Sequence, residues 1–125
     1  MTAISSPAFA RIGQTEEQVS ALFGKPIDAG TPDKEGVISN MYKNPTGEYL
    51  ALVQFVRGHS IAESYARVDS HTLSEKELSA FLQGNRGGKE WKKDPHKLAW
   101  ERSDHHVRGW CETLSGRPTL LIQLK

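Results

Sequence analysis

The chain has 125 residues, of which 37% are hydrophobic and 25% are charged. This length and composition are typical of one globular domain and exclude a wholly disordered chain. No apolar run approaches the roughly 20 residues that a membrane-spanning helix needs. Sixteen Lys and Arg residues against fifteen Asp and Glu residues give a formal net charge of +1, which removes the electrostatic argument for a nucleic-acid partner.

The first ten residues end in Ala8-Phe9-Ala10, the small-x-small spacing that signal peptidase cuts. Neither a basic stretch nor a long apolar stretch precedes it. We therefore interpret residues 1–10 as a flexible tail or as the remnant of a signal peptide. Residues 11–125 are expected to form a single α+β domain.

The first element is a helix that begins after Thr15. Thr15 is a suitable N-cap, and Gln18, three residues later, completes a capping box. Gly24 and Pro26 end the helix after about nine or ten residues. Its apolar face carries Val19, Leu22 and Phe23.

Three strands are expected next, over residues 37–43, 48–57 and 60–68, where β-branched and aromatic residues alternate between turn signals. In the middle strand both alternating faces are partly apolar. One face carries Tyr49 and Phe55 and the other carries Leu50 and Leu52. We therefore place this strand in the centre of the sheet.

A second helix begins after Ser74, with Glu77 at the capping-box position, and ends at Gly84-Asn85. Residues 86–97 are rich in Lys and Arg, and we interpret them as a solvated loop that offers a local basic patch. Three more strands are expected over residues 98–102, 106–114 and 119–124.

The two helices and their following strands are similar at a constant spacing, since position 74 minus position 15 is 59. We interpret residues 14–68 and 73–124 as pseudo-repeats, each made of one helix and three strands. The predicted fold is α+β, with one antiparallel sheet of about six strands and both helices packed on one face.

Residues 12–26 resemble the opening of the SmpA/BamE family of outer-membrane lipoproteins. The likeness rests on Ile12-Gly13, Thr15-Glu16-Glu17 and Leu22-Phe23-Gly24-Lys25-Pro26. The same fold occurs in duplicated form in the secreted β-lactamase inhibitor protein family, where each half sets a helix against an antiparallel sheet. The resemblance implies such a fold, and a periplasmic or secreted location in a bacterium.

The densest group of metal-ligand side chains is His105-His106, with Asp104 and Glu101 close by and His96 upstream. Imidazole and carboxylate groups suit zinc, although neighbouring residues of a strand point to opposite faces unless a turn reorients them. A polar hairpin tip is the other interpretation. Cys111, the single cysteine, excludes an internal disulfide, and we interpret it as a small buried hydrophobic residue.

Aromatic residues indicate a second kind of candidate site, a surface that binds another protein or a peptide. We name Tyr49, Trp91, Trp100 and Trp110 as candidate partner-binding residues if they share an exposed sheet face, with burial in the core as the alternative. No nucleophile elbow and no phosphate loop is present in the sequence. We therefore expect a non-enzymatic protein- or peptide-binding module of the bacterial envelope, without a cofactor. The alternative is a metal-binding protein or metal-dependent enzyme that uses the histidine group.

Overall fold

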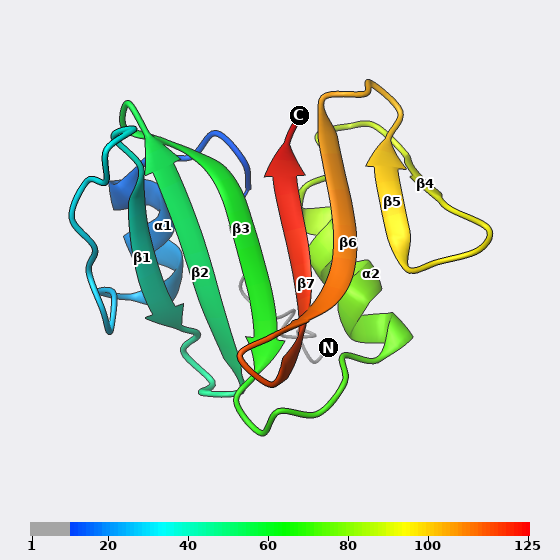
Figure 1. Ribbon diagram of the computed structural model, residues 1–125, viewed down its shortest axis with the longest axis horizontal. Coiled ribbons are helices and arrows are strands. Elements are labelled where there is room, and N and C mark those ends of the chain that lie inside the picture. The colour runs from blue at the N-terminus through cyan, green and yellow to red at the C-terminus, as the bar shows by residue number, and fades with distance from the viewer. Residues whose placement is uncertain (1–10) are drawn as a thin grey trace, which may run out of the picture.

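The computed structural model describes residues 11–125, so the predictions for residues 1–10 lie outside the described part. All strands of that part form one antiparallel sheet in the order β1-β2-β3-β7-β6-β5-β4. Figure 1 shows both helices behind this sheet, so no helix or strand of residues 11–125 covers its other face, which we call the open face. The elements are α1 (Glu16–Phe23), β1 (Ile38–Lys43), β2 (Tyr49–Val56), β3 (His59–Arg67), α2 (Glu75–Gly84), β4 (Trp91–Lys93), β5 (Ala99–Arg102), β6 (Val107–Leu114) and β7 (Arg117–Leu124).

The predicted antiparallel sheet with helices is confirmed, and so are both capping boxes. The Gln18 N–H donates to Oγ1 of Thr15 at 3.2 Å, and the Glu77 N–H donates to Oγ of Ser74 at 3.1 Å. Each box satisfies two amide groups that a helix start leaves without a partner. No helix in residues 11–125 is long and apolar enough to cross a membrane.

The predicted division into two repeats of one helix and three strands is wrong. The sheet has seven strands, and four of them follow α2. The additional strand is β4, which lies inside the predicted solvated loop of residues 86–97. It forms because Trp91 pairs with Arg102 of β5, and because its indole Nε1 donates to the Leu82 carbonyl of α2 at 2.6 Å.

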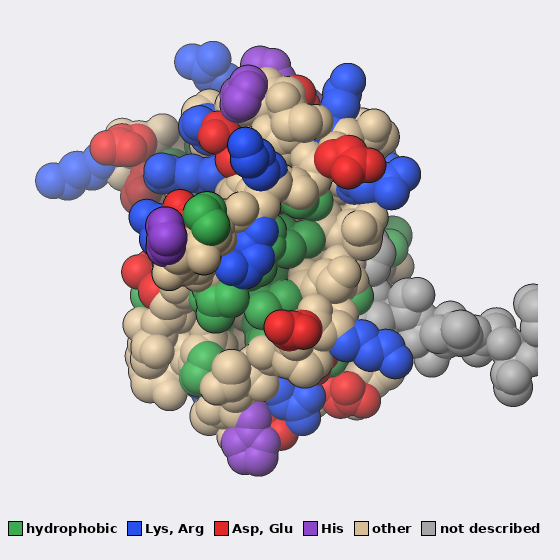
Figure 2. Space-filling model, turned by 90° about the vertical axis from the view of Figure 1, so that its right-hand side faces the viewer, with side chains coloured by type: hydrophobic (Ala, Val, Ile, Leu, Met, Phe, Trp, Pro, Cys, Tyr) green, Lys and Arg blue, Asp and Glu red, His purple; other side chains and the backbone are tan. Residues whose placement is uncertain are grey.

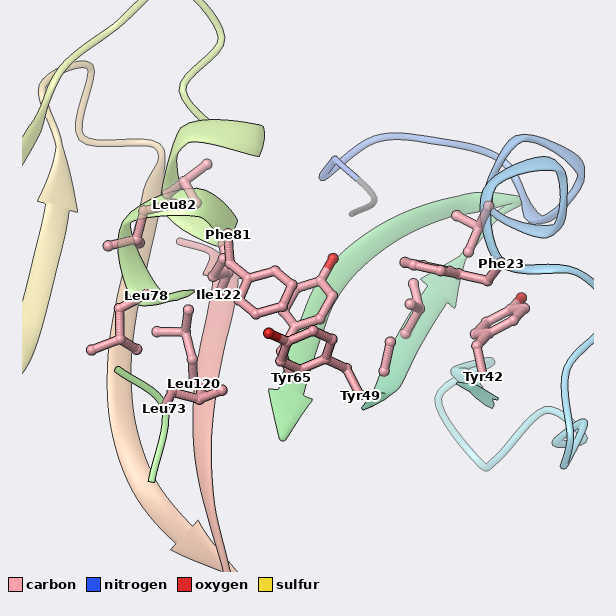
Figure 3. Close-up of a cluster of buried hydrophobic side chains, with 14 of the residues drawn as sticks. Phe23, Tyr42, Tyr49, Tyr65, Leu73, Leu78, Phe81, Leu82, Leu120 and Ile122 are labelled. Carbon is pink, nitrogen blue, oxygen red and sulfur yellow. The ribbon is translucent and has the colours of Figure 1, made fainter. Parts of the chain in front are cut away.

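The core lies between the helices and the covered face of the sheet. Figure 3 shows Phe81 of α2 directed at Tyr49 and Tyr65, and Phe23 of α1 close to Tyr42. The Phe81 and Tyr65 rings stack with centroids 4.1 Å apart, while Tyr49 meets Phe81 edge-on at 5.2 Å. Burial of these large side chains supplies much of the stability of the fold.

The two edges of the sheet differ. At the β1 edge the chain covers itself, because Asp28 bridges to Met41 and both of their N–H groups donate to the other's carbonyl. Gly30 makes this close approach feasible, since a Cβ at that position would lie 2.3 Å from the Ser39 carbonyl oxygen. At the other edge β4 pairs with β5 alone among the described strands.

Candidate functional site

The open face of the sheet carries a continuous row of half-buried side chains. Cross-strand pairing aligns one residue from each of six neighbouring strands, β1 to β5 in sheet order. Side chains that face each other across antiparallel strands point to the same side of a sheet. The members of this open-face row are Met41, Leu52, Ser64, Leu121, Trp110 and Ala99.

The small Ser64 lies in the middle of the open-face row and leaves the sheet surface hollow there. Leu52, Leu114 and Leu121 are among the residues that line a depression of about 220 Å³ at this point. Leu114 is 39% exposed although it is a large apolar residue. An uncovered apolar surface with a hollow centre is suited to receive an apolar side chain of another molecule.

The β4–β6 end of the open face is basic. A depression of about 780 Å³ there has Trp110 among its lining residues, together with Lys92, Lys97 and Arg108. The Arg108 guanidinium lies 4.9 Å from the centre of the Trp110 ring, which is a cation–π contact. Glu101 of β5 pairs with Arg108 across the sheet. Its negative charge is neutralised by Lys125, whose Nζ lies 2.7 Å from the Glu101 carboxylate.

The four predicted partner-binding residues do not share a face. Tyr49 points toward α2 and is only 6% exposed, and its hydroxyl donates to the Glu77 carboxylate. Trp91 and Trp100 line the side of the sheet next to α2. Trp110 is the one of the four that lies on the open face, opposite Leu121 of β7.

The predicted histidine group is not assembled around a common point. His105 is in a turn with a φ of +62° and contacts Glu101 at 3.1 Å. Asp104 is held by Arg102 at 2.7 Å, and this guanidinium lowers the pKa of Asp104 to about 2. Within residues 11–125 no three His, Cys, Asp or Glu side chains are placed to hold a metal ion.

Cys111 lies in β6, partly buried against the core. Burial raises the pKa of its thiol, and a thiol that keeps its proton is a weak nucleophile. This placement agrees with its interpretation as a small hydrophobic residue.

Sequence reasoning missed Glu63 of β3, which is 2% exposed and lies on the covered face. Tyr65 and Asn85 donate hydrogen bonds to its Oε1 at 2.9 and 2.6 Å. Burial raises the pKa of Glu63 to about 7, against the opposing effect of these hydrogen bonds. The signal in the sequence is its two-residue spacing from Tyr65, which puts both side chains on the same face of a strand.

No protein-family model and no curated protein sequence matches the chain. Among solved structures, the chain is similar in fold to a cysteine-rich secretory protein from Staphylococcus aureus, with a TM-score of 0.52 and 10% sequence identity. The similarity covers 91% of this chain but 44% of that structure, so this chain spans less than half the length of the protein it resembles.

Proposed function

We propose that this protein is a non-enzymatic module that binds another protein on the open face of its sheet. The observation that supports the proposal is the open-face row, in which five strands contribute an apolar residue and β3 contributes Ser64, and which no described segment covers. Large uncovered apolar surfaces are rare on monomeric proteins, and where they occur they usually mark interaction sites. Trp110 is of the residue type that most often dominates such interfaces.

The expected partner presents apolar side chains bordered by acidic groups. Apolar groups fit Leu52, Leu121 and Trp110, and carboxylates fit the basic end, where Arg108 and Lys97 form no salt bridge with a described residue. Such a charge arrangement favours the rate and specificity of association. We further propose a bacterial envelope location, which rests on the resemblance of residues 12–26 to outer-membrane lipoproteins.

The test compares three immobilised proteins in envelope extract: wild type, a Leu52→Gln/Trp110→Gln double variant, and Ile27→Gln as the control. Ile27 is 60% exposed and lies away from the open face, beside the β1 edge. Each variant is first shown to unfold cooperatively with urea. We expect a polypeptide that wild type and Ile27→Gln retain equally and that the double variant loses.

The retained polypeptide is then purified and titrated into all three proteins by calorimetry. We expect saturable binding with an affinity at least about tenfold lower for the double variant, which corresponds to roughly 1.4 kcal/mol. The proposal is wrong if the double variant binds as the wild type does, or if no polypeptide is specifically retained.

A further inference from the structure

The free edge of β4 carries backbone groups that no other strand within residues 11–125 uses. The Ser103 N–H donates to the Glu90 carbonyl, and the Asp94 N–H donates to the Ala99 carbonyl. Along a strand of an antiparallel pair, the backbone N–H and C=O groups of one residue point toward the partner strand, and those of the next residue point away from it. The N–H and C=O groups of Trp91 and Lys93 therefore point away from β5, along the edge where the sheet ends.

An apolar recess lies directly beside this edge. It has a volume of about 290 Å³ and is lined by residues of α2 and by residues of β4 and β5. Leu98, which is 49% exposed, and Trp100 contribute to its lining. Figure 2, which views the molecule from the side of β4 and β5, shows hydrophobic side chains gathered in the middle of this face with charged side chains around them.

The surroundings of the edge are basic. Residues 86–97 contain five Lys and Arg residues against Glu90 and Asp94, and none of the five forms a salt bridge with a described residue. Lysines on an edge strand oppose pairing with a second copy, because identical edges bring like charges together. The same lysines attract an acidic strand.

We infer that the β4 edge binds an extended acidic segment of another protein as an additional strand of the sheet. Backbone groups of the segment pair with Trp91 and Lys93, which is the usual means of strand addition at a sheet edge. Alternate side chains of the segment point to opposite faces. The apolar side chains of the segment enter the recess beside Trp91, and its acidic side chains face Lys92 on the opposite face of the sheet.

This edge site differs from the open-face row, although Lys92 also lines the basic depression at the β4–β6 end of the open face. The residues that line the recess come from α2, β4 and β5 and from Leu98, and none of them belongs to the open-face row. A nucleic acid is less suited to the edge, because strand addition pairs backbone N–H and C=O groups, which a sugar-phosphate backbone lacks.

The probe is a capped seven-residue peptide in which Glu and Leu alternate, titrated by calorimetry. Lys93→Pro removes the outward N–H without breaking a hydrogen bond inside the sheet, and proline is tolerated at a sheet edge for that reason. Lys93→Ala is the matched control, because it removes the same side chain and keeps the N–H. Thermal unfolding first confirms that both variants are folded.

We expect wild type and Lys93→Ala to bind the peptide, and Lys93→Pro to bind it at least about tenfold more weakly. Hydrogen exchange of the Trp91 and Lys93 amides should slow when the peptide is bound to wild type. A peptide with Lys in place of Glu should not bind. The Leu52→Gln/Trp110→Gln variant should bind the Glu-Leu peptide as wild type does, which separates this site from the open face.

Equal binding by Lys93→Pro and Lys93→Ala would overturn the inference, as would equal binding of the Lys-containing peptide. Two other occupants are tested in parallel. Dimers of wild type in sedimentation that Lys93→Pro abolishes would assign the edge to a second copy instead. Binding of single-stranded DNA in place of the peptide, measured by fluorescence anisotropy, would assign it to nucleic acid.

Discussion

Asn85 donates a hydrogen bond from Nδ2 to Oε1 of the buried Glu63, with the two atoms 2.6 Å apart. Asn85 is the C-cap of α2 and Glu63 is in β3, so this contact joins the end of the helix to the middle of the sheet. Oδ1 of the same Asn85 accepts the Ile12 N–H at 2.8 Å. The second carboxylate oxygen of Glu63 is buried and has no hydrogen-bond partner among the described residues.

Glu63 should make stability depend on pH. Burial raises the pKa of Glu63 from 4.5 to about 7 in the folded protein, so the folded state favours the protonated carboxyl. The contribution of this carboxyl to the free energy of unfolding is therefore complete below pH 4.5 and is lost as the pH rises through 7. Glu63→Gln places a neutral group of the same shape there. We expect it to equal wild type at pH 4 and to exceed wild type at pH 8 by roughly 3 kcal/mol in free energy of unfolding.

Urea denaturation at the two pH values measures this difference. Glu112→Gln is the control, because Glu112 is an exposed residue of the same sheet. A constant difference between Glu63→Gln and wild type across this pH range would contradict the expectation.

Glu77 should be more important for stability than Gln18, although both complete capping boxes. Oε1 of Glu77 accepts the Ser74 N–H at 2.8 Å, and Oε2 accepts bonds from Arg67 and from the buried Tyr49 hydroxyl. We expect Gln18→Ala to cost about 0.5–1 kcal/mol and Glu77→Ala about 2–4 kcal/mol, because it also leaves Tyr49 without its acceptor. Equal losses in urea denaturation would show that the contacts with Tyr49 and Arg67 contribute nothing.

Phe23→Ala and Leu82→Ala should each lower the free energy of unfolding by about 2–5 kcal/mol, the range for large buried side chains. Both side chains are 5% exposed, and each belongs to a different helix. Ile27→Ala, at an exposed position, should change stability by about 0.5 kcal/mol or less. Chemical denaturation tests all three, and a protein that tolerates both core changes would show that the helices do not close the core.

Zinc should leave the melting temperature unchanged. A ligand that binds only the folded state raises the melting temperature, and we expect no zinc to bind. The histidine group offers no set of three ligands in residues 11–125. Differential scanning fluorimetry with zinc and with a chelator measures this, and a His105→Ala/His106→Ala variant is the control. A zinc-dependent rise that the variant lacks would establish a metal site.

Local sequence signals were sufficient for elements with strong caps or strong alternation. The Ser74 and Glu77 pair identifies the start of α2 because both groups act within one helical turn. Strand β4 has only three residues and no such pattern. Its formation depends on the contact of Trp91 with Leu82, nine positions earlier, which a local pattern does not contain.

The candidate surface was harder to predict than the strands. Along β2 both faces are apolar, so alternation alone does not tell whether Tyr49 or Leu52 faces the helices. The structure buries Tyr49 and leaves Leu52 half-buried on the open face. The same ambiguity holds for Trp100 and Trp110, whose side-chain type suits a core and an interface equally.

Gly30 has a consequence for how copies of this protein associate. A side chain at this position would collide with the Ser39 carbonyl and push residues 27–30 away from β1. A sheet with two free edges can add identical copies on both sides and grow into a fibre, whereas a sheet with one free edge stops at a pair. A residue with no side chain therefore limits the length of any edge-to-edge polymer of this protein.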